Sequence, residues 1–306
     1  MIDVKKIAWF LLLTFAVSWS IAGIFFALGG KVTSPLAGVV FLLYMFVPMA
    51  MALVVQKGIY RQPVVGPLGI SFRLNKWFPA AWFLPLLFSL AAFGISLLLP
   101  GVTYAPLLAT LQQRLTPEQI AQIQPVLSKI PDLLTMLIML FAGLSAGITV
   151  NAIAAFGEEL GWRGLLQREL APLGFWGSSL LIGAIWGLWH APIIWHGYNY
   201  PQHPHLGVVM MMLFCMLFGT VISYVRLRAK SVIAAAIMHG TLNGVAGLTV
   251  LYTSGGSDLT TGALGLAGFL VLIALNILII LYERFIAKEP VMAEFLGDQV
   301  AAPAEG

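Results

Sequence analysis

Two adjacent carboxylates, Glu158 and Glu159, interrupt an apolar stretch and are followed by Arg163. A charged side chain costs at least about 2.5–3.5 kcal/mol at the bilayer centre, so charges in such stretches usually mark function. Helical residues at i and i+4 share one face, so we expect Arg163 to pair with Glu159. Glu158 is then the less compensated acid, suited to act as a general base on water. An ordinary salt bridge at a helix end is the alternative explanation.

Two further polar sites lie in later apolar stretches. His190 follows Trp186 by one helical turn in IWGLWHAP, so we expect the indole to pack against the imidazole. His239 and Asn243, spaced i and i+4 in IMHGTLN, point the same way, and both can donate hydrogen bonds to an oxyanion. Each residue alone is also consistent with helix packing. Their joint occurrence in separate apolar stretches favours a hydrolytic site.

The composition indicates a membrane protein. Of 306 residues, 60% are hydrophobic and 9% charged, against about 45–50% and about 25% in soluble domains. The net charge of +4 is spread between apolar stretches, where membrane orientation accounts for it, so we expect no nucleic-acid partner. The single cysteine, Cys215, excludes an internal disulfide and a zinc–thiolate cluster.

Eight apolar stretches are long enough to cross a bilayer, which takes about 20 residues per helix. They are residues 7–28, 36–56, 77–99, 133–157, 176–195, 207–225, 232–252 and 263–283. The sequence therefore predicts an all-α polytopic membrane protein with about eight transmembrane helices. The first stretch is longer than a signal-peptide core, so we expect it to be retained.

The chain divides into three predicted parts. Residues 1–130 supply three spans and an amphipathic outer helix that Thr116 caps; residues 131–285 form the membrane core with the polar sites; residues 286–306 form a flexible cytoplasmic tail. Residues 164–175 are expected to form a cytoplasmic interfacial helix. At 1.5 Å per residue these boundaries place Glu158 near the surface and His190 about 20 Å deeper.

The basic residues predict the orientation. With eight spans, all of the 16 lysines and arginines except Lys31, Arg114 and Lys129 fall on the side of the two termini. Positive residues concentrate in cytoplasmic loops. We therefore expect an integral protein of the cell membrane with both termini in the cytoplasm.

The three polar motifs together resemble one protein family. They are Glu158-Glu159-x-x-x-Arg163, an aromatic-x-x-x-His190 and His239-x-x-x-Asn243. Their order and spacing over about residues 130–250 are similar to those of the CPBP family, the CAAX-protease and bacteriocin-processing group also called Abi proteins. This family includes the Ras-converting CAAX endopeptidase. One departure is Trp186, where the family more commonly has Phe.

The resemblance implies eight helices around a central cavity and an intramembrane endopeptidase acting on lipidated, CAAX-type or membrane-associated peptides. By this analogy Glu158 activates water with help from His190. His239 and Asn243 stabilise the oxyanion. Glu159, Arg163 and Trp186 support them.

The metal requirement and the function class have alternatives at this stage. Glu158, His190 and His239 are residue types that suit Zn²⁺, whereas the HExxH motif of soluble zinc proteases is absent. Glutamate-activated water without an obligatory metal is preferred. A proton-coupled transporter also uses buried Glu, Arg and His, and a non-catalytic bacteriocin-immunity or binding protein on the same scaffold is the third alternative.

Overall fold

The computed structural model describes residues 2–292 and is almost entirely helical. Its helices are α1 (Val4–Ala27), α2 (Pro35–Leu53), η1 (Val54–Ile59), α3 (Trp77–Ser96), α4 (Leu107–Gln112), α5 (Pro117–Leu127), α6 (Asp132–Gly147), α7 (Val150–Glu159), η2 (Leu160–Leu166), α8 (Gln167–Glu169), η3 (Ala171–Leu173), α9 (Gly174–Trp189), α10 (Ala191–Trp195), α11 (Pro204–Ala229), α12 (Val232–Val250) and α13 (Leu266–Phe285). Two short strands, β1 (Thr103–Tyr104) and β2 (Thr253–Ser254), pair antiparallel. Most of the predicted tail, from residue 293 onward, lies outside the described residues.

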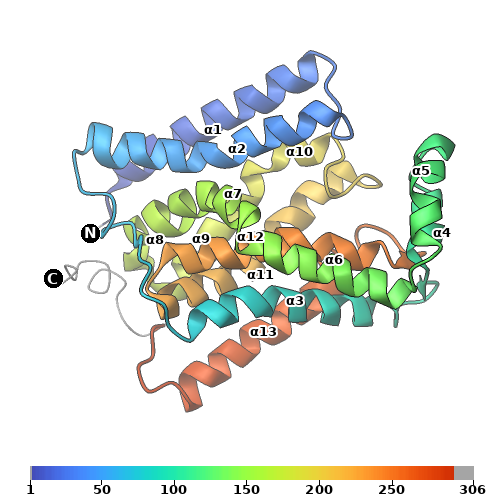
Figure 1. Cartoon of the computed structure of the whole chain (residues 1–306). Helices are drawn as coiled ribbons and strands as arrows, with labels where there is room; N and C mark the ends of the chain where they lie inside the picture. Colours follow the sequence, from blue (N-terminus) through green and yellow to red (C-terminus); the bar gives the residue numbers. More distant parts are fainter. Residues whose placement is uncertain (1, 293–306) are drawn as a thin grey trace.

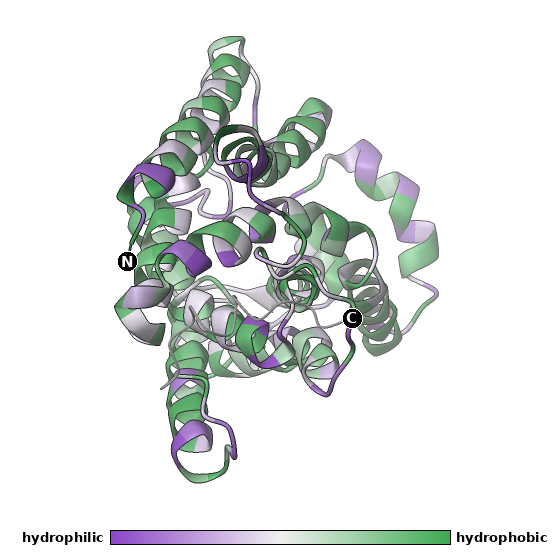
Figure 2. Ribbon diagram, turned by 90° about the vertical axis from the view of Figure 1, so that its left-hand side faces the viewer, coloured by the Kyte–Doolittle hydropathy of each residue, from purple (hydrophilic) through white to green (hydrophobic). Residues whose placement is uncertain are grey.

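The all-α polytopic membrane fold is confirmed. Among the described residues seven helices are long and apolar enough to span a bilayer, and an eighth is counted if α5 and α6, bent by 102°, form one span. Figure 2 shows that most of the helical ribbon is hydrophobic. Many large apolar side chains on the outer helix faces are exposed, as expected of surfaces that contact lipid.

Helix α12 lies at the centre of the bundle and packs against α3, α6 and α7, while α9 packs along α11. Helices α1 and α2 form a pair on one side, and α2 contacts α7. The first turn of α1 and the last turn of α13 lie at the same end of the bundle (Figure 1). This arrangement agrees with an even number of crossings.

The predicted span 133–157 is two helices rather than one. Helix α6 ends at Gly147 and α7 begins at Val150, with a non-helical backbone at Thr149 (φ −121°, ψ −106°). The Thr149 hydroxyl donates to the Ser145 carbonyl at 2.7 Å, four residues earlier, and the Thr149 N–H bonds to Ala146 instead. Such side-chain bonds compete with the helical pattern and bend helices.

The prediction of an interfacial helix at residues 164–175 is wrong. Helices α7, η2 and α8 form one continuous rod from Val150 to Glu169, and its second half is buried in the protein. The rod continues the crossing begun by α6 toward the end of the bundle where α8 lies (Figure 1). Glu158 and Glu159 are therefore near the middle of a helix and not at its end.

The amphipathic helix predicted near Thr116 is present as α5. Its capping box is complete: the Thr116 hydroxyl accepts from the Gln119 N–H, and the Gln119 side chain accepts from the Thr116 N–H. The sharp bend to α6 directs α5 across the direction of the neighbouring spans (Figure 1). Helix α5 lies at the end of the bundle opposite the first turn of α1.

Candidate active site

The two adjacent glutamates lie in the protein interior. Glu158 is 2% exposed, and Glu159 and Arg163 are completely buried. The pair expected from the spacing is present, since Nη1 of Arg163 lies 3.2 and 3.1 Å from the two carboxylate oxygens of Glu159. Arg163 belongs to the π-helical η2, a form that occurs often at functional sites.

Close helix approach positions this rod. A Cβ atom on Gly157 would lie 2.7 Å from the Met45 carbonyl oxygen of α2. On the other side, a Cβ atom on Gly240 of α12 would lie 2.6 Å from the Ala152 nitrogen of α7. Glycine at these two positions lets the backbones of three helices come together, as small residues do in membrane bundles. The glutamates are thereby brought to the face of α12 that carries His239.

Trp186 of α9 contacts Glu158 directly. Its indole Nε1 donates a hydrogen bond of 2.7 Å to Oε2 of Glu158. The guanidinium of Arg163 lies over the same indole, 4.5 Å from the ring centroid. Trp186 therefore does more than pack against His190, the role that the sequence predicted for it.

His190 occupies the junction between α9 and α10. Its backbone N–H bonds to Gly187 rather than to Trp186. The Trp186 carbonyl instead lies 2.8 Å from Nδ1 of His190. Because a carbonyl only accepts, Nδ1 must carry the proton, and Nε2 of the neutral ring keeps its lone pair. His190 is thus arranged to accept a proton or a hydrogen bond at Nε2.

The N-terminal helices hold the same junction. The carbonyl oxygen of Trp189, the residue before His190, accepts a 2.6 Å bond from the Tyr44 hydroxyl of α2. It also accepts a 3.2 Å bond from the indole of Trp19 in α1. The Ile193 N–H, which would bond to this carbonyl in a regular α-helix, bonds to the His190 carbonyl instead. Side chains from two distant helices therefore satisfy a carbonyl at this helix end.

His239 is held by the other glutamate. Its Nδ1 lies 2.9 Å from Oε1 of Glu159, and both side chains are buried. Glu159, ion-paired with Arg163, is an acceptor, so Nδ1 of His239 carries a proton. Glu159 therefore orients an imidazole in addition to pairing with Arg163.

Asn243 lies one turn after His239 on α12 and is exposed. No other described residue hydrogen-bonds to its side-chain amide. Its N–H groups are therefore available to a ligand, in contrast to the buried groups around Glu158.

One indole connects the candidate catalytic groups. The ring of Trp186 lies 5.7 Å from that of His190 and 5.2 Å from that of His239, centroid to centroid. With Glu158 on its Nε1, the indole has a carboxylate and two imidazoles around it. Side chains from three helices thus meet around one indole ring.

The zinc-ligand set considered from the sequence, Glu158, His190 and His239, is not grouped as a metal-binding cluster in the described part of the chain. Among residues 2–292 no three His, Cys, Asp or Glu side chains are grouped so that they could hold a metal ion. Nδ1 of each imidazole is engaged by the protein, one with the Trp186 carbonyl and the other with Glu159, so Nε2 is the only nitrogen that either ring has left for a ligand. We therefore derive no step through a metal.

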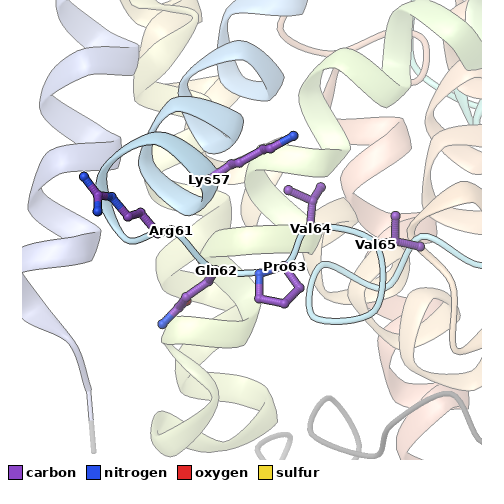
Figure 3. A pocket seen from close by; sticks show the side chains of 6 residues that line it. All are labelled: Lys57, Arg61, Gln62, Pro63, Val64 and Val65. Atoms are coloured by element: carbon purple, nitrogen blue, oxygen red, sulfur yellow. The ribbon is translucent and has the colours of Figure 1, made fainter.

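A surface hollow elsewhere is not part of this site. It has a volume of about 570 Å³ and is lined by Lys57, Arg61, Gln62, Pro63, Val64 and Val65. Figure 3 shows the side chains of Lys57 and Arg61 pointing in different directions. None of the candidate catalytic residues lines it.

Comparisons with known proteins found two matches, and the family match covers the region that carries the site. Residues 140–245 match a family described as "Rce1-like: Type II CAAX prenyl endopeptidase Rce1-like". The chain is also similar to a protein of Methanococcus maripaludis named "CAAX prenyl protease 2", with 32% identity over 108 residues. That alignment covers 30% of this chain and 36% of the relative, so the chain matches about a third of the relative's length.

Proposed function

We propose that this chain, which carries a domain of the Rce1-like CAAX protease family in its membrane core, is an intramembrane endopeptidase that hydrolyses a peptide bond with water activated by Glu158. The observation that carries the proposal is the buried carboxylate of Glu158. One of its oxygens is held by Trp186, and within the described residues the other accepts no hydrogen bond.

Glu158 acts as the general base. The unengaged oxygen, Oε1, takes a proton from water while the water oxygen attacks the scissile carbonyl carbon. His190 assists through Nε2, which accepts a hydrogen bond from the same water. Positioned bases of this kind contribute about 10²–10⁴-fold to rate. Glu158 then returns the proton to the leaving amine.

His239 and Asn243 stabilise the oxyanion of the tetrahedral intermediate. Glu159 fixes the tautomer of His239 so that Nδ1–H faces the carboxylate. The imidazole, when protonated, donates from Nε2, and the free amide of Asn243 adds a second donor. Donors in a site shielded from water are worth more than in solution.

The surroundings of the site support a membrane-associated or lipidated substrate. The catalytic groups lie between helices whose outer faces are apolar, so a membrane-associated or lipidated peptide reaches them more readily than a soluble one. The relative named as a CAAX prenyl protease supports a lipidated C-terminal tail as the first substrate to test. Membrane lipid and such a peptide are the expected partners.

The test is cleavage of a fluorogenic prenylated peptide by purified protein in lipid nanodiscs, with and without a chelator. Glu158→Gln and His190→Ala should each lower kcat by about 10²-fold or more. Glu283→Gln is the matched control, because Glu283 is a buried carboxylate paired with Arg228 away from the site.

Normal cleavage by both site variants would overturn the mechanism. Solute flux without proteolysis would favour a transporter. Full biological activity of the Glu158→Ala variant would favour a non-catalytic binding protein.

A further inference from the structure

We infer that Trp186 is a positioning residue that selects which oxygen of Glu158 acts as the base. This inference rests on the proposed function and deepens it. The indole N–H occupies Oε2 at 2.7 Å. Among the described residues no donor occupies Oε1, so Oε1 is the oxygen left to receive a proton from water.

The indole is itself fixed on several sides. Trp186 is 2% exposed. The Arg163 guanidinium lies over the indole ring. The backbone carbonyl of Trp186 accepts a hydrogen bond from the imidazole of His190. Its ring also contacts that of His239. A donor held this firmly fixes the plane of the carboxylate, because a hydrogen bond to an ionised acceptor is short and directional.

The indole N–H of Trp186 can be removed without removing the aromatic ring, because phenylalanine has a ring but no N–H. Trp186→Phe keeps an aromatic ring between Arg163 and the two histidines but removes the bond to Glu158. A buried carboxylate that loses a donor then rotates or recruits water. A hydrogen bond to a charged group contributes about 1.5–3 kcal/mol, which corresponds to about 10- to 100-fold in rate.

The kinetic test compares Trp186→Phe with Trp162→Phe. Trp162 is also a fully buried tryptophan, and its Nε1 has no hydrogen-bond partner among the described residues. We expect Trp186→Phe to lower kcat about 10- to 100-fold with KM changed less than about threefold, and Trp162→Phe to leave both near the wild-type values. Equal losses in the two variants, an unchanged kcat, or an effect confined to KM would each overturn the inference.

A second measurement does not depend on activity. In protein labelled with ¹⁵N-tryptophan, the indole resonance that disappears in Trp186→Phe should be shifted downfield as a hydrogen-bonded N–H. The same resonance should move upfield in Glu158→Ala and stay in place in Glu283→Gln. A Trp186 resonance unaffected by Glu158→Ala would overturn the contact even if proteolysis is observed. If the contact is confirmed but no peptide is cleaved, the proposed function fails instead.

Discussion

Glu159 is the residue whose removal tests the architecture of the site most directly. Its carboxylate is completely buried and binds both Arg163 and His239. In Glu159→Gln the guanidinium of Arg163 stays buried without its counterion. Breaking one partner of a buried ion pair costs about 3–5 kcal/mol, so we expect the free energy of unfolding to fall by that amount.

The double variant separates the charge from the packing. Replacing Arg163 with Met in the Glu159→Gln background removes both charges and keeps a long apolar side chain in the space beneath Trp186. Because apolar residues of similar volume often replace buried ion pairs at little cost, most of the lost stability should return. We expect a coupling energy between the two positions of about 2 kcal/mol or more, within the range for residues in contact.

The assay is reversible unfolding in mixed micelles for wild type, both single variants and the double variant, with cleavage measured on the same samples. Stability should recover in the double variant, whereas kcat should stay low, because a neutral amide stabilises a protonated His239 less well than a carboxylate. Additive losses of stability, or a single variant that costs less than about 1 kcal/mol, would refute the reasoning that Glu159 and Arg163 form one buried unit.

Two further predictions concern α12. Gly240→Val should separate α12 from α7, because its Cβ would lie 2.6 Å from the Ala152 nitrogen. The free energy of unfolding should fall by about 1–3 kcal/mol. The control Gly247→Val, whose Cβ meets nothing within 4 Å, should have little effect in the same assay. Asn243→Ala should lower kcat by about 10²–10³-fold, as removal of an oxyanion donor does, and leave the melting temperature unchanged because the side chain is exposed; a lower melting temperature with normal kcat would contradict the role proposed for Asn243.

The residue types and their spacing predicted the relations within single helices of the candidate site. The helical period joined Glu159 to Arg163 and placed His239 and Asn243 on one face of a helix, because such relations are local in sequence. The hydrogen bond from His239 to Glu159 spans 80 residues, and the one from Trp186 to Glu158 spans 28. No periodicity reports contacts of this kind, so they appear only when the helices are assembled.

The depth problem raised by the sequence has a specific cause. Hydropathy ended the fourth span at residue 157 because charges follow, but the helix continues through the charges to Glu169. Glu158 is therefore as deep as Trp186, to which it bonds. Burial of the charged residues with their partners, which composition alone does not reveal, allows the helix to continue.

The bonds from Tyr44 and Trp19 to the Trp189 carbonyl show that support for the site extends beyond the stretch that the family model matches. Both donors precede residues 140–245, the stretch that matches the Rce1-like family model, yet they bond to the peptide unit next to His190. Residues 140–245 alone therefore lack two of the donors that support this helix end. A chimaeric protein in which other helices replaced the first two would have to supply new hydrogen-bond donors to the Trp189 carbonyl.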